Sequence, residues 1–123
     1  MRACATPADI RDPGQVEAAV ETVCESLGGL DLLVNNAGGQ FPSPAEGISP
    51  NGWRAVVETN LTGTFLVTRE VARRALLPQR SGAIVNVVVD MSRGLPGAAH
   101  SGAARAGVEN LTRSLAVEWG PHN

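Results

Sequence analysis

Apolar side chains recur along this chain at two spacings, and the spacing changes from segment to segment. Between Pro13 and Leu27 the apolar positions fall every three or four residues, as on one face of a helix. Asp12 is a suitable N-cap, Pro13 a suitable first helical residue, and the pair Gly28–Gly29 a suitable stop. The pattern therefore predicts a first helix between Pro13 and the two glycines.

The same spacing predicts two further helices. One covers about residues 50–77, with Ser49 as its N-cap and a proline at its first position. It contains Gly63, which costs about 1 kcal/mol relative to alanine in a helix and which we therefore expect to serve close packing. The other covers about residues 100–118 and ends at Gly120–Pro121.

Continuous apolar runs separate these helices. "LDLLVNN" predicts a buried strand over about residues 30–35 and "GAIVNVVV" a second over about 82–89, while "RACATPAD" weakly indicates an earlier strand. Strands that alternate with helices are typical of an α/β fold in which helices cover both faces of a parallel sheet. We predict a doubly wound parallel sheet of about three strands and three helices, with ligands bound beyond the carboxyl ends of the strands.

Composition narrows the functional classes. With 123 residues, of which 43% are hydrophobic, the chain is expected to form one domain, and a net charge of −2 gives no electrostatic basis for binding nucleic acid or an anionic membrane. Cys4 and Cys24 are expected to be free thiols in a reducing compartment. No apolar run reaches membrane-spanning length, no signal peptide is recognisable and no metal-ligand spacing occurs, so we expect a cytoplasmic protein without a metal site.

Three features could carry chemistry, and each has a structural alternative. The segment Asn35–Gly38 follows a strand and lets a flat ligand approach the backbone, although Asn-Ala-Gly also forms ordinary turns. Asn60 lies mid-helix, where asparagine is disfavoured unless it bonds something specific; the alternative is a solvent-facing or locally bonded side chain. Ser101, Arg105 and Glu109 lie on successive turns of the last helix, where the alternative is a surface ion pair between Arg105 and Glu109.

Together these segments resemble the classical short-chain dehydrogenase/reductase family. "LDLLVNNAGG" matches its Asn-Asn-Ala-Gly strand end, and "WRAVVETNLTGTFLVTREVA" resembles its next helix. "GAIVNVVV" matches the following strand and "SGAARAGVENLTRSLAVEWGP" the active-site helix, so the match covers nearly the whole chain. Within the family, the chain looks most like peroxisomal trans-2-enoyl-CoA reductases and their bacterial relatives, with the 2,4-dienoyl-CoA reductases next.

The resemblance implies that the whole chain, 1–123, is a partial NAD(P)-binding Rossmann domain. The family's N-terminal glycine-rich βαβ turn, which holds the cofactor pyrophosphate, and its C-terminal substrate-capping part are absent from this sequence. Asp9 would accept a hydrogen bond from the adenine amino group while Ile10 packs on the ring, and Asn36, Ala37 and Gly38 would lie along the adenosine ribose. We therefore expect NADPH or NADH as the cofactor of a full-length parent, and only weak binding of it by this chain.

The resemblance also implies the catalytic positions. Asn60 stands at the family's active-site asparagine, Ser101 at its tyrosine and Arg105 at its lysine, so Arg105 would also lie near the cofactor ribose. The chain contains neither Tyr nor Lys. A serine hydroxyl is a far weaker acid than a phenol and an arginine does not titrate, so neither replaces the lost groups as a proton donor. A second alignment, with Glu109 at the tyrosine and Arg113 at the lysine, stays open.

These losses favour reduction of a conjugated carbon–carbon bond over carbonyl reduction, because the former needs a stabilised oxyanion more than a proton donor beside it. We expect a fragment of an NAD(P)H-dependent oxidoreductase that reduces the 2,3 double bond of trans-2-enoyl-CoA thioesters in fatty-acid metabolism. Two alternatives stay open: a non-catalytic, truncated remnant of the family, and a reductase of 2,4-dienoyl-CoA or 3-oxoacyl thioesters. The resemblance further implies an acyl-CoA substrate and a homo-oligomer formed through the helices that carry Asn60 and Ser101.

Overall fold

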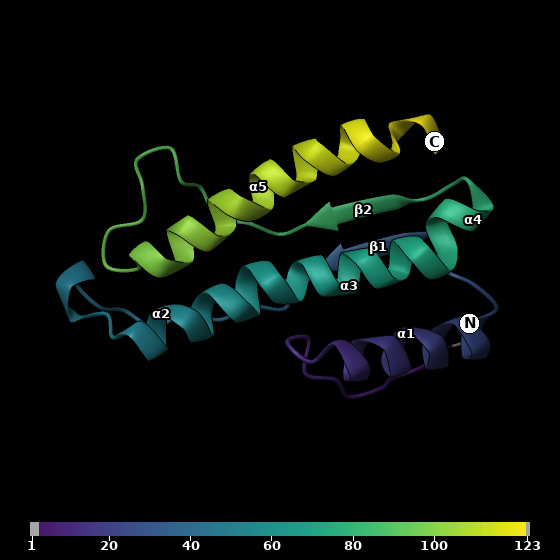
Figure 1. The fold of residues 1–123 in the computed structure, drawn as a ribbon, viewed down its shortest axis with the longest axis horizontal. Coiled ribbons are helices and arrows are strands. Elements are labelled where there is room, and N and C mark those ends of the chain that lie inside the picture. The colour runs from purple at the N-terminus through teal and green to yellow at the C-terminus, as the bar shows by residue number, and fades with distance from the viewer. Residues whose placement is uncertain (1–2, 123) are drawn as a thin grey trace.

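The computed structural model describes residues 3–122, in which two parallel strands lie beside three long helical segments (Figure 1). The strands pair in register from Leu32 with Ala83 to Asn35 with Asn86. The elements in chain order are α1 (Pro13–Leu27), β1 (Leu32–Asn35), the 3-10 turn η1 (Ala45–Gly47), α2 (Pro50–Val57), η2 (Glu58–Gly63), α3 (Thr64–Val71), η3 (Ala72–Leu76), α4 (Leu77–Gln79), β2 (Ala83–Asn86), α5 (Ala99–Trp119) and the 3-10 turn η4 (Gly120–His122).

Helix α1 begins and ends where the sequence predicts. The Asp12 carboxylate accepts hydrogen bonds from the backbone N–H groups of Gln15 (3.1 Å) and Gly14 (2.9 Å), and these bonds hold the pKa of Asp12 below its usual range. Pro13 takes the first helical position. Gly28 ends the helix in the left-handed conformation, at φ +88°, which a residue with a Cβ rarely adopts.

Residues 50–79 form one continuous helix, slightly longer than predicted. Ser49 caps it, because its Oγ accepts a hydrogen bond from Gly52 N at 3.0 Å. Two π-helical segments, η2 and η3, lie within it. The second precedes Pro78, which has no N–H to offer the carbonyl four residues earlier, so the regular bonding breaks there. In the first, a Cβ on Gly63 would lie 2.7 Å from the Ile10 side chain, which confirms close packing at that glycine.

All three helical segments pack on one face of the sheet. Leu33 and Ile84 point into the core that the helices share with the strands, whereas Leu32 and Val34, which alternate with Leu33, are each 54% exposed. Val85, opposite Val34, is 48% exposed. The prediction of helices on both faces is therefore wrong for residues 3–122, because every long helix in this part of the chain goes to the same side.

The predicted third strand does not form within the described part of "RACATPAD". Residues 3–9 have no strand pairing, and Met1 and Arg2 lie outside the described residues. Each of the two strands that do form has four paired residues, fewer than the apolar run that predicted it. The remaining residues of each run lie outside the paired ladder. The fold is thus a partial Rossmann-like unit with two strands and three helices.

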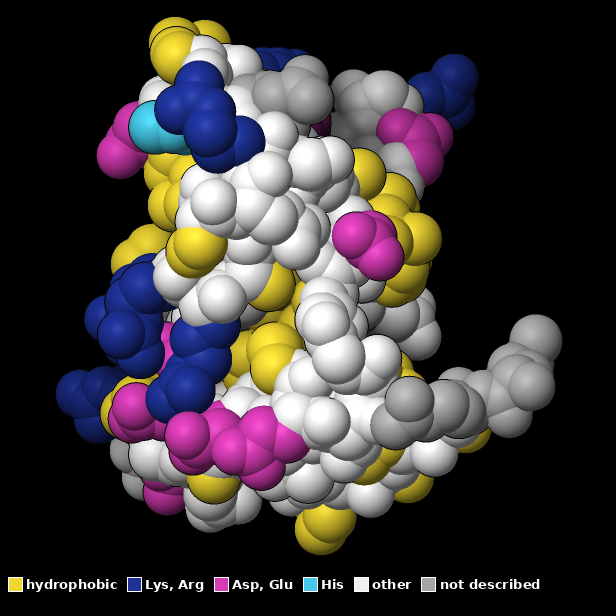
Figure 2. Space-filling model, turned by 90° about the vertical axis from the view of Figure 1, so that its right-hand side faces the viewer, with side chains coloured by type: hydrophobic (Ala, Val, Ile, Leu, Met, Phe, Trp, Pro, Cys, Tyr) yellow, Lys and Arg dark blue, Asp and Glu magenta, His cyan; other side chains and the backbone are white. Residues whose placement is uncertain are grey.

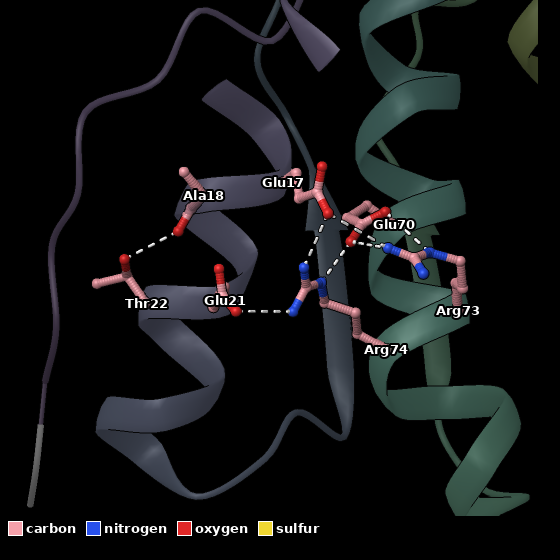
Figure 3. A network of polar contacts seen from close by, with 7 residues as sticks. All are labelled: Glu17, Ala18, Glu21, Thr22, Glu70, Arg73 and Arg74. Carbon is pink, nitrogen blue, oxygen red and sulfur yellow. Dashed lines mark hydrogen bonds and ion pairs between the residues drawn. The ribbon is translucent and has the colours of Figure 1, made fainter. Parts of the chain in front are cut away.

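The hydrophobic core lies between α1 and the long helix. Val16 and Val20 from α1 pack against Val71, Ala75 and Leu76, all of them buried. A cluster of ion pairs borders this core (Figure 3).

In that cluster, the Glu70 carboxylate, with only 6% of its side chain exposed, accepts hydrogen bonds from Arg73 (2.9 Å) and Arg74 (2.5 Å). Arg74 reaches across to Glu17 (3.1 Å) and Glu21 (3.4 Å) of α1. The ion pairs therefore join α1 to the long helix.

A pocket lies at the end of the sheet where β2 begins. This pocket of about 280 Å³ is bounded by α4, β2 and the last turns of α5, and apolar side chains such as Leu76, Leu115 and Trp119 line much of it. Figure 2 looks onto this end of the molecule and shows hydrophobic side chains in the hollow, with charged groups around it. The polar residues Asn86 and Thr112 reach its inner wall.

Candidate functional site

Two of the predicted site residues, Asn60 and Arg105, meet around a third, Gly38. A Cβ on Gly38 would lie 2.5 Å from Asn60 Oδ1 and 3.1 Å from a guanidinium nitrogen of Arg105. Gly38 follows β1, Asn60 belongs to η2 in the long helix and Arg105 belongs to α5. The fold thus brings together three segments that are far apart in the sequence, and only a residue without a side chain fits between the other two.

Asn60 is buried, with 3% of the residue exposed, and its side chain is fully used. Its Nδ2 donates to the carbonyls of Gly39 (2.6 Å) and Val56 (2.8 Å), and its Oδ1 accepts from Gly39 N (3.2 Å). The solvent-facing alternative is therefore wrong. Asn60 holds the loop after β1 against the helix, and it does so from a π-helical segment, a distortion that is frequent at functional sites.

Ser101 is completely buried at the start of α5. Its Oγ donates a hydrogen bond to Gln40 Oε1 at 2.5 Å, and its backbone N–H donates to Nδ1 of His100 at 2.9 Å. His100 is also completely buried and packs edge-to-face on Phe41, with ring centroids 4.5 Å apart. Its Nε2 has no hydrogen-bond partner within residues 3–122.

Three residues of this site, Gln40, Phe41 and His100, were not predicted from the sequence. The available signal was local: a glutamine and a phenylalanine directly follow the Asn-Asn-Ala-Gly-Gly segment, and a histidine directly precedes Ser101. The sequence does not show that these residues contact one another, because Gln40 of the loop and Ser101 at the start of α5 are 61 residues apart along the chain.

Arg105 lies half-buried beside this loop. One of its terminal nitrogens donates to the backbone carbonyl of Val87 at 3.0 Å, just beyond β2. The surface ion pair between Arg105 and Glu109 does not form. Glu109 pairs instead with Arg113 one turn later, on the exposed side of α5. The structure thus brings Ser101 and Arg105 to the Asn60 loop, whereas Glu109 and Arg113 satisfy each other.

The predicted adenosine contacts divide into two groups. Ile10, Asn36 and Ala37 line a pocket of about 210 Å³ beside β1 and α3. Asp9 does not line it. Its carboxylate is held by the side chain and the backbone N–H of Arg11, with the shortest contact at 2.6 Å, and this hydrogen bonding lowers the pKa of Asp9 to about 2.

A chain of side-chain hydrogen bonds crosses the sheet beneath the site. Asn35 Nδ2 donates to Thr68 Oγ1 of α3 and to Asn86 Oδ1 of β2, both at 2.8 Å. Asn86 Nδ2 donates in turn to Thr112 Oγ1 of α5 at 2.9 Å. The first asparagine of the Asn-Asn-Ala-Gly segment therefore braces two strands and two helices, and leaves the following residues to line the pocket.

Comparison with known proteins identifies the family. A family model for short chain dehydrogenases matches residues 1–123. The chain belongs to the short-chain dehydrogenase family. Among curated relatives, the rat peroxisomal 2,4-dienoyl-CoA reductase, (3E)-enoyl-CoA-producing, is 42% identical over 116 residues, which are 94% of this chain and 39% of that protein.

A bacterial relative and a solved structure agree with this assignment. The Bacillus subtilis (strain 168) protein named "Probable 2,4-dienoyl-CoA reductase" is 42% identical over 113 residues, 91% of this chain and 44% of that protein. The citronellol catabolism dehydrogenase AtuB of Pseudomonas aeruginosa PAO1 superposes with a TM-score of 0.89 at 46% identity, over 95% of this chain and 47% of its own. The chain spans less than half the length of each of these short-chain dehydrogenases.

Short-chain dehydrogenases use NADH or NADPH in general, and the residues present fit one part of such a dinucleotide. The pocket lined by Ile10, Asn36 and Ala37 combines apolar and amide side chains, as the site of a flat heterocycle or ribose does. No glycine-rich phosphate turn occurs in the sequence. Within residues 3–122 no group of three metal-ligating side chains gathers, and no helix there is long and apolar enough to span a bilayer.

Proposed function

We propose that this chain is the central part of an NAD(P)H-dependent reductase of conjugated acyl-CoA thioesters, with trans-2-enoyl thioesters as its substrate class. The observation that carries the proposal is the make-up of the site: Asn60 orders the loop, Arg105 supplies a fixed positive charge, and Ser101 donates its hydroxyl hydrogen to Gln40 and so is not available as a base toward an alcohol. The names of the rat and Bacillus subtilis relatives support an acyl-CoA substrate, and they make a 2,4-dienoyl thioester the second candidate.

The reaction moves two electrons and two hydrogens onto the conjugated bond. When bound, the reduced nicotinamide supplies a hydride to the β carbon. The electron pair of the double bond then shifts toward the thioester oxygen, and a proton from water ends on the α carbon. In this proposal Arg105 stabilises the negative charge on that oxygen; its support is that one end of the guanidinium donates to the Val87 carbonyl and another nitrogen lies beside Gly38.

Oxidation of an alcohol fits this site less well. It requires a group that accepts the hydroxyl proton as the hydride leaves. Ser101 is fully buried and already donates its hydroxyl hydrogen to Gln40, and an arginine keeps its charge throughout the physiological range. The same reasoning disfavours reduction of a 3-oxoacyl thioester, in which a proton must reach the alkoxide oxygen directly.

A hybrid enzyme tests the proposal. Residues of this chain replace the matching 113 residues of the Bacillus subtilis relative, and turnover is measured with NADPH and NADH on 2-enoyl-CoA, 2,4-dienoyl-CoA and 3-oxoacyl-CoA. We expect reduction of the enoyl or dienoyl thioester and little of the oxoacyl thioester. Arg105→Met is expected to lower kcat about a hundredfold, the effect of losing one oxyanion donor, whereas Arg113→Met on the same helix is the matched control. Faster turnover of 3-oxoacyl-CoA would overturn the proposal.

For the chain by itself we propose a non-catalytic state. Leu32, Val34 and Val85 leave one face of the sheet apolar and exposed, and the phosphate-binding turn is absent from the sequence. Isothermal titration with NADPH is expected to show no micromolar binding. A dissociation constant in the micromolar range would contradict this view of the isolated chain.

A further inference from the structure

The loop after β1 is fastened to both helices of the site at three consecutive residues. Gly39 exchanges two hydrogen bonds with the Asn60 side chain, Gln40 accepts one from Ser101, and Phe41 packs on His100. Successive attachments to η2 and α5 leave this loop little freedom, so the Gln40 side chain is presented from a fixed backbone.

Gln40, which accepts a hydrogen bond from Ser101, lies between the serine hydroxyl and solvent. The serine is completely buried, its hydroxyl hydrogen goes to Gln40 Oε1, and its backbone N–H goes to His100. Gln40 itself is exposed. A ligand that enters this site therefore meets Gln40 first and reaches the serine hydroxyl only if Gln40 is displaced.

The bond from Ser101 also orients the glutamine amide. Because Oε1 is held toward the serine, the Nε2–H₂ group on the same planar amide faces away from it, and Nε2 has no hydrogen-bond partner within residues 3–122. Two residues earlier, the free end of the Arg105 guanidinium lies beside Gly38. An amide donor and a fixed cation thus flank the same short loop, a combination suited to an oxygen that gains negative charge.

We propose that Gln40 binds the substrate's thioester carbonyl through Nε2, and that Ser101 is a positioning residue that holds Gln40 in this orientation. The proposal rests on the function proposed above for its substrate class. It reassigns the direct contact with substrate from Ser101 to a residue of the loop. It also gives a reason for a buried serine at this point of α5: the hydroxyl acts on the glutamine amide and not on the reacting atoms.

Nuclear magnetic resonance on the full ¹⁵N-labelled chain tests the positioning step without any ligand. The side-chain amide signals of Gln40 are identified by their loss in Gln40→Leu. We expect Ser101→Ala to make these signals more mobile, by heteronuclear relaxation, and Ser101→Thr to restore them because threonine keeps the hydroxyl. The amide of Gln15, which bonds Asp12 at the start of α1, is the internal control. Unchanged Gln40 dynamics in Ser101→Ala would overturn the role given to the serine.

The binding step is tested with the crotonic acid thioester of N-acetylcysteamine, a small enoyl thioester, against N-acetylcysteamine alone. The Gln40 amide is expected to shift with the thioester only, and Gln40→Leu to weaken its binding about three- to tenfold, the effect of one hydrogen bond. The absence of a Gln40 shift, whether or not other signals move, would overturn the proposal. The two experiments can also disagree. If the Gln40 amide shifts but the hybrid enzyme prefers 3-oxoacyl-CoA, the carbonyl-binding role of Gln40 stands and the proposed enoyl reduction is refuted.

Discussion

Replacing Glu70 by glutamine removes the central charge of the ion-pair cluster between α1 and the long helix. The carboxylate is buried to 6% exposure and accepts three hydrogen bonds, two from Arg73 and one from Arg74. A hydrogen bond to a charged group is worth about 1.5–3 kcal/mol, but Arg73 is 61% exposed and its share is largely screened by solvent. We therefore expect Glu70→Gln to lower the free energy of unfolding by about 2 kcal/mol.

The same residue gives the effect a pH dependence. Hydrogen bonds from Arg73, and then from Arg74, hold the pKa of Glu70 below its ordinary value of 4.5 in the folded chain. A carboxylate whose pKa falls on folding stabilises the protein above its unfolded pKa and loses that contribution as the pH drops through its folded value. The difference between the native chain and Glu70→Gln should thus be full at pH 7 and shrink below about pH 4.5.

Urea denaturation followed by circular dichroism at pH 7 and at pH 3 measures both effects. Glu17→Gln and Glu21→Gln remove partners that are 55% and 52% exposed, and each should cost only tenths of a kcal/mol. Glu118→Gln, on an exposed turn of α5, is the matched control and should leave stability unchanged. Equal stability of Glu70→Gln and Glu118→Gln at pH 7, or a difference that grows at pH 3, would refute the reasoning.

Three further substitutions test other parts of the fold by the same denaturation assay. Gly63→Ala places a Cβ 2.7 Å from Ile10 and should lower the free energy of unfolding by about 1 kcal/mol. Gly120→Ala, whose Cβ would have nothing within 4 Å, should leave the free energy of unfolding unchanged. Equal effects of the two substitutions would contradict close packing at Gly63. Asn35→Ala breaks the chain of hydrogen bonds across the sheet and should cost about 2 kcal/mol, with faster amide exchange in both strands as a second readout. Asp12→Ala removes the cap of α1 and should cost about 1 kcal/mol, with fraying at that end of α1 only.

Local signals in the sequence were sufficient for the helices. The caps at Asp12 and Ser49 and the stop at Gly28 are set by residues within a turn of the feature itself, and the structure confirms each. The π-helical segment η2 carries a tertiary contact that no local signal indicates. Asn60 bonds Gly39, and this partner lies 21 residues away along the chain.

The sequence does not show which face of the sheet a helix covers. Periodicity shows that α1, α3 and α5 each have an apolar side, but it does not show that all three turn toward the same side of the sheet. The site divides in the same way. Asn60, Arg105 and Gly38 could be proposed from family motifs, and the structure brings them together, whereas the pairing of Ser101 with Gln40 depends on how the loop after β1 meets the start of α5.

The uncovered face of the sheet bears on how this 123-residue chain behaves when it is produced on its own. Leu32, Val34 and Val85 present a short row of aliphatic side chains beside strand edges whose backbone groups are unpaired within residues 3–122. Apolar surfaces beside unpaired strand edges favour association between copies of a chain. The 123-residue chain, when produced on its own, should therefore aggregate at a lower concentration than its Leu32→Ser, Val34→Thr variant, and light scattering over a concentration series would show the difference.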